Sequence, residues 1–287
     1  MIINRLTGRA GNLCRKIFRM LGAPEISQRR ISEFLVKVGD VTPLPQNKYP
    51  RSLAVVIPCY GHASFLPAAL KSIASQSRLP DEVIAVDDHS PDCTNTIVEE
   101  YFSRLRELGD IRCTLLTNDR NRGQAFSLNQ AISAISSELV MILNDDDYLM
   151  HDAIATIYEL FEQHEDLVMI GGASIHFSHD QELELHSRVG RSTLDAAKMS
   201  LSIRQPSDVL NYRRYNDLNM THSGCCFLKS AWEKVGGYYS NKRKRLVPFS
   251  DRDFQLRVNA LFPVGVSSDI SFSFWRSGSS VDQGRDS

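Results

Sequence analysis

Three consecutive carboxylates follow a short apolar run at residues 139–143; they are Asp145, Asp146 and Asp147. The run is branched and uncharged, as a buried strand is, so the carboxylates stand where that strand leaves a sheet. Ligands of open α/β sheets bind at the carboxyl ends of the strands. Adjacent like charges need a compensating cation, and carboxylate oxygens suit Mg²⁺ or Mn²⁺. The triplet therefore predicts a site for a metal ion and a diphosphate, and the alternative is a solvated acidic turn.

The chain before the triplet alternates between strand and helix patterns. Strands are expected at residues 53–57, 82–86, 113–116 and 139–143, and helices at 65–73, 94–108 and 125–135, with Thr94 as an N-cap. This order, with short connections, predicts a parallel sheet with helices on both faces.

The chain after the triplet is less regular. Helices are expected at residues 153–164, 230–235 and 250–260, and strands at 167–171, 223–228, 264–266 and 270–275. Periodicity fades between residues 178 and 218, which we expect to form an irregular functional loop.

Residues 1–50 form a basic extension, and its last ten residues hold three prolines and read as a linker. Apolar residues between positions 13 and 21 recur at helical spacing among arginines. Such a basic amphipathic helix can lie on an anionic membrane surface, and the alternative is a helix that packs on the main domain. The main domain is expected at residues 51–275, followed by a polar tail at 276–287.

The bulk composition argues against several classes of protein. With 42% hydrophobic residues and 23% charged ones, the 287-residue chain is typical of a globular protein. The net charge of −1 implies no general attraction to nucleic acid. The six cysteines form no C-x-x-C pair and indicate reduced thiols of a cytoplasmic protein. No apolar stretch approaches the ~20 residues needed to cross a bilayer, and the N-terminus lacks the apolar segment of a secretory signal.

Six short motifs occur in one order along residues 53–260. They are VVIPCY at 55–60, VDDHSPD at 86–92, NRG at 121–123, LNDDDYL at 143–149, WEKVGGY at 232–238 and DRD at 251–253. Together they resemble the family 2 glycosyltransferases. That resemblance implies the GT-A fold, a Rossmann-like, mixed and mostly parallel sheet flanked by helices. It also implies an inverting transfer of sugar from a nucleotide donor.

The resemblance also implies roles on the donor side. Pro58 and Tyr60 would line the nucleobase pocket, and Asp88 would accept hydrogen bonds from a uracil or thymine base. Arg122 lies in the turn where the family contacts the nucleotide. On this basis residues 51–150 form the nucleotide-binding half and residues 151–275 the acceptor half.

The metal motif of the family is Asp-x-Asp, and here Asn144 stands in its first place. An asparagine hydrogen-bonds a ribose hydroxyl but brings no charge. The resemblance makes Asp146 the main ligand of Mn²⁺ or Mg²⁺, with Asp145 or Asp147 assisting. Asp147 is predicted as the second metal ligand and Asp145 as a contact of the nucleotide-sugar.

The catalytic base of the family is the Asp of a Glu-Asp pair at the head of a late helix. Here the pair reads Ser250-Asp251, so Asp251 is the candidate base and Asp253 the fallback. The structural alternative for Asp251 is an acid that stabilises the first turn of a helix.

His222 is equally compatible with acceptor contact and with a structural role. The basic run at residues 242–245 is either a loop that closes over the diphosphate or a solvated loop.

The expected partners are a nucleotide-sugar donor and a carbohydrate, lipid-linked or protein acceptor. The expected location is the cytoplasm, with peripheral contact at the inner membrane through the basic extension.

Two alternatives stay open. A nucleotidyltransferase would carry a Gly-rich phosphate loop after the first strand, which residues 58–62 lack. A non-catalytic sugar-nucleotide binder would explain the departures at Asn144 and Ser250.

Overall fold

The computed structural model describes residues 28–38, 52–177, 200–206, 218, 220–247, 249–267 and 272–276. The amphipathic helix predicted among the first 21 residues, the proline-rich linker and the polar tail lie outside these residues. So does most of the irregular stretch between residues 178 and 218.

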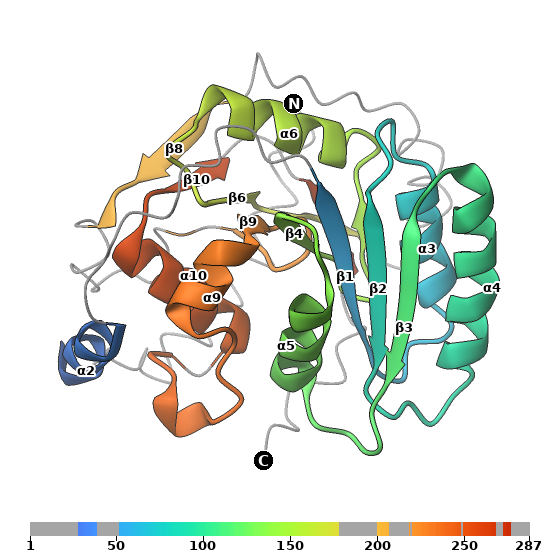
Figure 1. Ribbon diagram of the computed structural model, residues 1–287, viewed down its shortest axis with the longest axis horizontal. Helices are drawn as coiled ribbons and strands as arrows, with labels where there is room; N and C mark the ends of the chain where they lie inside the picture. Colours follow the sequence, from blue (N-terminus) through green and yellow to red (C-terminus); the bar gives the residue numbers. More distant parts are fainter. Residues whose placement is uncertain are drawn as a thin grey trace.

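An eight-stranded sheet forms the centre of the molecule, in the order β3-β2-β1-β4-β9-β6-β10-β8 (Figure 1). Only β8 and β9 run antiparallel to their neighbours in this sheet. The strands are β1 (Leu53–Cys59), β2 (Glu82–Asp87), β3 (Arg112–Thr117), β4 (Leu139–Ile142), β6 (Met169–Gly172), β8 (Leu201–Arg204), β9 (Cys226–Leu228) and β10 (Val264–Ser267).

A three-stranded sheet lies beyond the carboxyl end of β4. Its order is β5-β11-β7, formed by β5 (Tyr148–Leu149), β11 (Ser273–Arg276) and β7 (Ile175–Phe177). Because β5 follows the acidic triplet directly, this sheet holds the chain just after the triplet in place.

Helices cover both faces of the large sheet, and alternate residues of β1 point into two separate cores. Leu53, Val55 and Ile57 pack with α3 (Leu66–Ala74), α4 (Thr94–Leu108) and α6 (Ala153–Gln163). Ala54 and Val56 face the other core, with α2 (Gln28–Val38), α5 (Gln124–Ala134), α9 (Lys229–Val235) and α10 (Ser250–Leu261). The wholly buried strands explain why the sequence reads as continuous apolar runs rather than alternating ones.

The predicted mixed, mostly parallel α/β sheet is confirmed, and two local expectations are corrected. Thr94 is the first helical residue of α4 and Cys93 precedes it; Asp92 accepts hydrogen bonds from both the backbone and the hydroxyl of Thr94. The four strands before the triplet are parallel as expected, and the mixed character of the sheet comes from β9, which returns between β4 and β6, and from β8. The stretch expected to be irregular contains β8, a short edge strand whose half-exposed residues give little apolar signal.

A fully buried arginine joins three helices on the second face of the sheet. The Arg257 side chain pairs with Asp253 at 3.0 Å and donates to the carbonyls of Val235 and Gly237 at 2.8 and 2.6 Å. Its guanidinium also lies 6.0 Å from the ring centroid of Phe34 in α2. The Phe34 side chain is buried, so α2 belongs to the main domain rather than to a detached extension.

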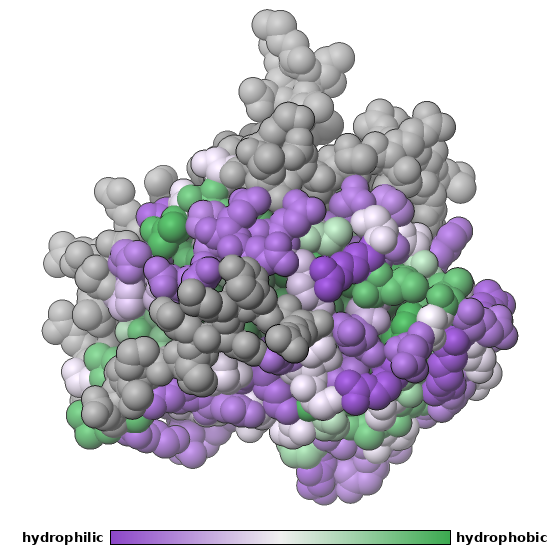
Figure 2. All heavy atoms as spheres, turned by 45° about the horizontal axis from the view of Figure 1, so that its top comes forward, coloured by the Kyte–Doolittle hydropathy of each residue, from purple (hydrophilic) through white to green (hydrophobic). Residues whose placement is uncertain are grey.

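The described surface carries a mixture of polar and apolar side chains. On the face in Figure 2, polar side chains cover most of the described surface and apolar ones form separate groups. Within the described residues, no helix combines the length and apolar character that crossing a membrane requires.

The end of α9 tests how tightly the second face is packed. Gly236 and Gly237 have φ values of +78° and +68°, so a side chain at either position is strained by the left-handed backbone. A Cβ at Gly237 would also lie 2.6 Å from Asn129 Oδ1, whereas at Gly236 the nearest atom is 3.8 Å away. We expect Gly236→Ala to cost about 1 kcal/mol and Gly237→Ala about 3 kcal/mol, measured by urea unfolding. Equal costs for the two variants would contradict the close approach of α5 to this turn.

Candidate active site

The candidate site lies at the carboxyl ends of β1, β2 and β4, which are neighbours and parallel. Residues that are distant in the sequence meet here because parallel strands release their chains at the same edge. The loop after β1 brings Tyr60 and His62, the end of β2 brings Asp88, and the acidic triplet follows β4.

Asp145 ties the end of β4 to the loop after β1. Its carboxylate accepts a hydrogen bond from the backbone N–H of Tyr60 at 3.0 Å and lies 2.9 Å from Nδ1 of His62. The residue is only 5% exposed. Burial raises the pKa of Asp145, and the hydrogen bond and charge of His62 act in the opposite direction. An ionised Asp145 therefore depends on positive charge nearby.

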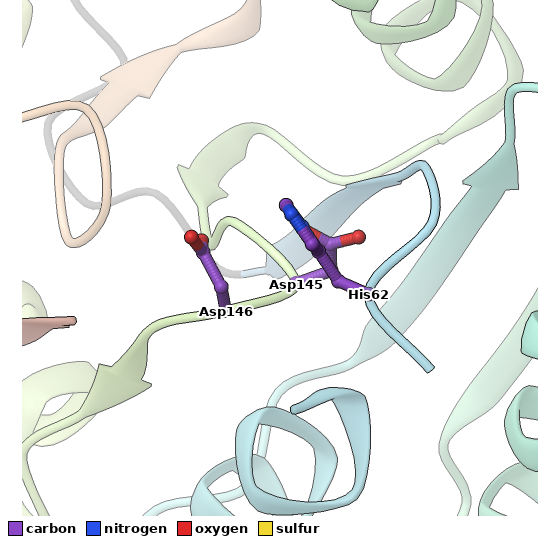
Figure 3. Close-up of side chains that lie close together, drawn as sticks. All are labelled: His62, Asp145 and Asp146. Carbon is purple, nitrogen blue, oxygen red and sulfur yellow. The ribbon is translucent and has the colours of Figure 1, made fainter. Parts of the chain in front are cut away.

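His62, Asp145 and Asp146 form a group of metal-ligating side chains (Figure 3). One ligand atom from each residue lies within 4.8 Å of the others. Asp146 is 7% exposed, so two adjacent carboxylates are shielded from water. Their mutual repulsion and the donor types fit a divalent cation. The described residues thus contain an acidic group that could hold a metal ion and that includes Asp146, the predicted main ligand.

Asp147 is held differently from its two neighbours. It is fully buried and accepts a hydrogen bond from the Ser223 hydroxyl at 2.5 Å and from the Asn144 amide at 3.2 Å. The side-chain oxygen of Asn144 accepts from Gln124 at 3.1 Å. The structure therefore leaves Asp147 out of the metal-ligating group and makes it a link between the triplet and the chain before β9.

Asp88 holds the segment between β3 and α5. Its carboxylate accepts hydrogen bonds from the backbone N–H groups of Arg122 and Gly123 at 2.8 and 2.7 Å and from Asn118 at 2.7 Å. Asp88 is 3% exposed. Asp88 thus accepts three hydrogen bonds from within the chain. Its main role in this structure is to hold the loop between β3 and α5 in shape.

The other residues predicted to contact the nucleotide differ in accessibility. Tyr60 is 41% exposed, which leaves its ring accessible to the nucleobase of a nucleotide. Pro58 is a buried residue within β1 and pairs with Val86 of β2. The Arg122 guanidinium stacks 4.5 Å from the ring centroid of Phe126 and pairs with Asp119 at 3.2 Å.

The candidate base lies in the first turn of α10. Asp251 is partly buried there. Its charge acts on His222, whose pKa is lowered by burial and raised by Asp251. Nε2 of His222 lies 3.1 Å from the Tyr238 hydroxyl. Because His222 directly precedes Ser223, the base side of the site is connected to the acidic triplet through one short segment.

Asp253 does not suit the role of fallback base. It is fully buried and pairs with Arg257. Its second oxygen accepts from the backbone N–H of Leu246 at 2.5 Å. This carboxylate serves the packing of α10, and a substrate hydroxyl would have to displace a buried ion pair to reach it. Asp251 is left as the candidate base.

The basic run before α10 divides into two parts. Lys242–Lys244 form an exposed turn of 3₁₀-helix, whereas Arg245 is buried and donates to the Tyr239 carbonyl at 2.6 Å. The run is therefore neither a wholly solvated loop nor a free cationic lid.

Comparison with known proteins adds the deciding observation. The sequence model of Glycosyl transferase family 2 matches residues 54–236, which is more than half of the chain. The chain belongs to glycosyltransferase family 2. The match includes the ends of β1, β2 and β4 that form the acidic site, and the resemblance stated from the motifs is confirmed.

Curated relatives of this family 2 glycosyltransferase are similar over less than half of the chain. Glycosyltransferase GlyG of Streptococcus pneumoniae is 26% identical over 129 residues, which are 45% of this chain and 40% of that protein. A GalNAc(5)-diNAcBac-PP-undecaprenol β-1,3-glucosyltransferase of Campylobacter jejuni is 30% identical over 107 residues, which are 37% of this chain and 33% of that protein. The matched part thus spans about two-fifths or less of these relatives.

Solved structures support the fold. S. aureus TarS residues 1–349 superpose with a TM-score of 0.56 at 19% identity, covering 79% of this chain and 60% of that one. The mannosyltransferase PcManGT of Pyrobaculum calidifontis superposes with a TM-score of 0.51 at 19% identity, covering 85% and 66%. The expected GT-A fold is thereby confirmed.

His62 is the site residue that sequence reasoning missed. Its only signal was its position, five residues after the end of a predicted strand. A single histidine in a loop has many structural explanations, and only the fold shows that this loop crosses to the end of β4.

The role of Asp88 in this glycosyltransferase can be tested through the loop it holds. Asp88→Ala removes the acceptor for two backbone N–H groups, so hydrogen exchange at Arg122 and Gly123 should accelerate at least about tenfold. The matched control is Asp119→Ala, which removes a carboxylate from the exposed end of the same loop. Amide exchange followed by mass spectrometry or NMR measures both. Unchanged exchange in Asp88→Ala would contradict the assignment.

Proposed function

We propose that the chain transfers a sugar from a nucleotide-diphospho-sugar, UDP- or dTDP-linked, to a hydroxyl group with inversion at the anomeric carbon. One observation carries the proposal. Asp145 and Asp146 form a pair of carboxylates shielded from water where the end of β4 meets the loop after β1, in a chain that belongs to glycosyltransferase family 2. Such a pair suits a divalent cation that also contacts phosphate oxygens.

The names of similar proteins support the classes of donor and acceptor. TarS structures contain UDP and UDP-GlcNAc, and the PcManGT structure contains GDP-Man and Mn²⁺. Relatives include the undecaprenol-linked glucosyltransferase and the succinoglycan biosynthesis protein ExoO of Rhizobium meliloti. We therefore place the reaction in glycan or surface polysaccharide biosynthesis, in the cytoplasm, with a carbohydrate or lipid-linked acceptor.

The proposed reaction is an in-line displacement. The acceptor hydroxyl attacks C1 of the donor sugar while the nucleoside diphosphate leaves from the opposite face. Asp251 takes the proton of the attacking hydroxyl, as a general base near the acceptor must. A bound Mn²⁺ or Mg²⁺ would offset the charge that builds on the leaving phosphate.

Other residues of the chain prepare this geometry. Tyr60 offers an exposed ring to the base of the nucleotide. Asp88 fixes the loop of Arg122 and Gly123 beside it. Asp146 would hold the metal, with Asp145 and His62 at its side, and Asn144 stands where the ribose is expected. Asp147 and Ser223 keep the triplet at a fixed position relative to the segment of His222.

The basic extension is proposed to add peripheral contact with an anionic membrane. Flotation with anionic liposomes tests this with residues 1–27 removed. The truncation should spare α2, because Phe34 belongs to the core. We expect the truncated chain to lose binding at low salt, and equal binding by the full and truncated chains would refute contact through this segment.

The proposed base is tested with Asp251→Asn, which keeps the shape of the side chain but removes its proton-accepting charge. We expect transfer to fall at least about 100-fold while binding of the nucleotide changes little, because base catalysis contributes roughly 10²–10⁴-fold. The donors are UDP-, dTDP-, GDP- and CMP-sugars with Mn²⁺, first ranked by thermal shift and then assayed with an acceptor for release of the nucleotide, which is a nucleoside diphosphate for the first three and CMP for the last.

Two controls sharpen this experiment. Asp253→Asn should lower stability rather than the rate per folded molecule, because it breaks the buried pair with Arg257. A wild-type chain that binds a donor but never turns it over would favour the non-catalytic sugar-nucleotide binder. Full transfer by Asp251→Asn would show that another group is the base.

A further inference from the structure

We propose that His62 supplies a nitrogen ligand to the metal ion at the acidic site and makes that site prefer Mn²⁺ to Mg²⁺. The inference rests on the proposed function in so far as that function places a divalent cation beside Asp146. It adds a residue from a different strand end to the metal site and assigns that residue a role in ion choice.

The backbone of His62 is fixed by the fold. β1 ends at Cys59, and Gly61 turns the chain with a φ of +70°. The His62 carbonyl then accepts hydrogen bonds from the N–H groups of Phe65 and Leu66 at 2.9 and 3.1 Å, at the start of α3. The imidazole is therefore held between a central strand and a packed helix, which is the rigid support that a metal ligand needs.

The ring of His62 is oriented by Asp145. Nδ1 lies 2.9 Å from Oδ1 of Asp145, and Figure 3 shows the imidazole standing against that carboxylate. A proton on Nδ1, donated to Asp145, puts the ring lone pair on Nε2. Nε2 is shielded from solvent. Metal-binding histidines commonly donate their second nitrogen to a carboxylate in this way, which fixes the tautomer and strengthens the ligand.

Asp145 is itself kept in place from the other side. Its second oxygen accepts the backbone N–H of Tyr60 at 3.0 Å. Rotation of the Asp145 carboxylate away from His62 would break this bond too. The pair of His62 and Asp145 is thus one rigid unit, and Asp146 is the next residue along the chain.

Distance and charge both fit a shared ion. The ligand atoms of His62, Asp145 and Asp146 lie within 4.8 Å of one another. Because Nδ1 is held on Asp145, the ion would be bound by Nε2 of His62 and the Asp146 carboxylate, while Asp145 keeps the ring oriented. Ligands at about 2.1 Å from one ion are separated by roughly 3–4 Å, so a small movement of Asp146 and His62 suffices to bring their donor atoms onto one ion. Asp145 and Asp146 are 5% and 7% exposed, and a cation removes the repulsion between them.

The donor set decides which ion is favoured. Mg²⁺ is a hard ion that takes oxygen ligands and keeps several waters. Imidazole nitrogen binds first-row transition ions much better than it binds Mg²⁺. A site with the imidazole of His62 beside the Asp146 carboxylate therefore favours Mn²⁺, whereas the same site without the imidazole would distinguish the two ions less.

The direct test is electron spin-echo spectroscopy of Mn²⁺ bound to the full chain, with natural-abundance and with ¹⁵N-labelled histidine. We expect a nitrogen coupling in the wild-type spectrum that changes with the label and disappears in His62→Gln. The control variant is His164→Gln, which alters a histidine at the end of α6, outside the metal-ligating group. The labelled wild-type spectrum stands even if His62→Gln folds poorly.

Affinity gives a second readout. His62→Gln should weaken Mn²⁺ binding about 10- to 100-fold, the usual effect of losing a ligand or its partner, and change Mg²⁺ binding by less than about threefold. Both affinities come from calorimetric titration of the metal-free protein, without donor. The inference is overturned if wild-type protein binds Mn²⁺ without a histidine coupling, or if His62→Gln keeps the full preference for Mn²⁺.

These outcomes separate the inference from the proposed function. If His62→Gln keeps its preference for Mn²⁺ and the wild type still transfers sugar, His62 is not a ligand and the proposed function stands. If the wild type shows the histidine coupling but transfers no sugar from any donor, the metal site is right and the proposed function fails.

Discussion

The carboxylate of Asp145 joins the ends of two central strands, and the rest of the site depends on that joint. It holds the loop after β1 through the Tyr60 N–H and the His62 ring. Without it, the Tyr60 N–H would lose its acceptor and the His62 ring would lose its fixed orientation toward the acids that follow β4. The joint has a cost, because it buries an acid next to a second acid, and burial raises the pKa of Asp145. A bound cation would compensate for this cost, so the feature that positions the site also suits it to the proposed metal ion.

The segment of His222 and the first turn of α10 are coupled to Asp145 and its neighbours by side chains. Asp147 binds the Ser223 hydroxyl, and the neighbouring His222 contacts Tyr238. The Tyr238 ring stacks on Phe254 of α10 at a centroid distance of 4.3 Å. The buried Arg257 fixes the end of α9 against the same helix, whose first turn carries Asp251. A rigid chain of contacts thus runs from the acidic triplet to the candidate base.

The sequence was sufficient to predict the parts of the fold that repeat a simple physical pattern. Buried strands such as β1 and β4 read as short apolar runs, and their order along the chain predicted the parallel core. β8 was missed because an edge strand with partly exposed residues lacks that pattern. That the sheet is mixed came only from the family resemblance, because the direction of a strand such as β9 depends on long connections that local residues do not encode.

The site could be predicted only in part for a related reason. The acidic triplet and the first turn of α10 have local signatures, so Asp146 and Asp251 could be proposed from spacing and resemblance. Asp253 has the same local signature as Asp251, and only the fold shows it paired with Arg257. His62 has no signature at all. Its place in the site follows from the pairing of β1 with β4, which brings His62 to Asp145 although the two residues are 83 apart in the sequence.

The central claim is that the acids at the joint of β1 and β4 hold a metal ion and the diphosphate of a nucleotide. Anomalous scattering from a crystal grown with Mn²⁺ and UDP tests it most directly. The account predicts a strong manganese peak against the Asp146 carboxylate, with diphosphate density beside it and the base next to Tyr60. A nucleotide bound elsewhere, or a diphosphate at this edge with manganese absent from the acids, would contradict it.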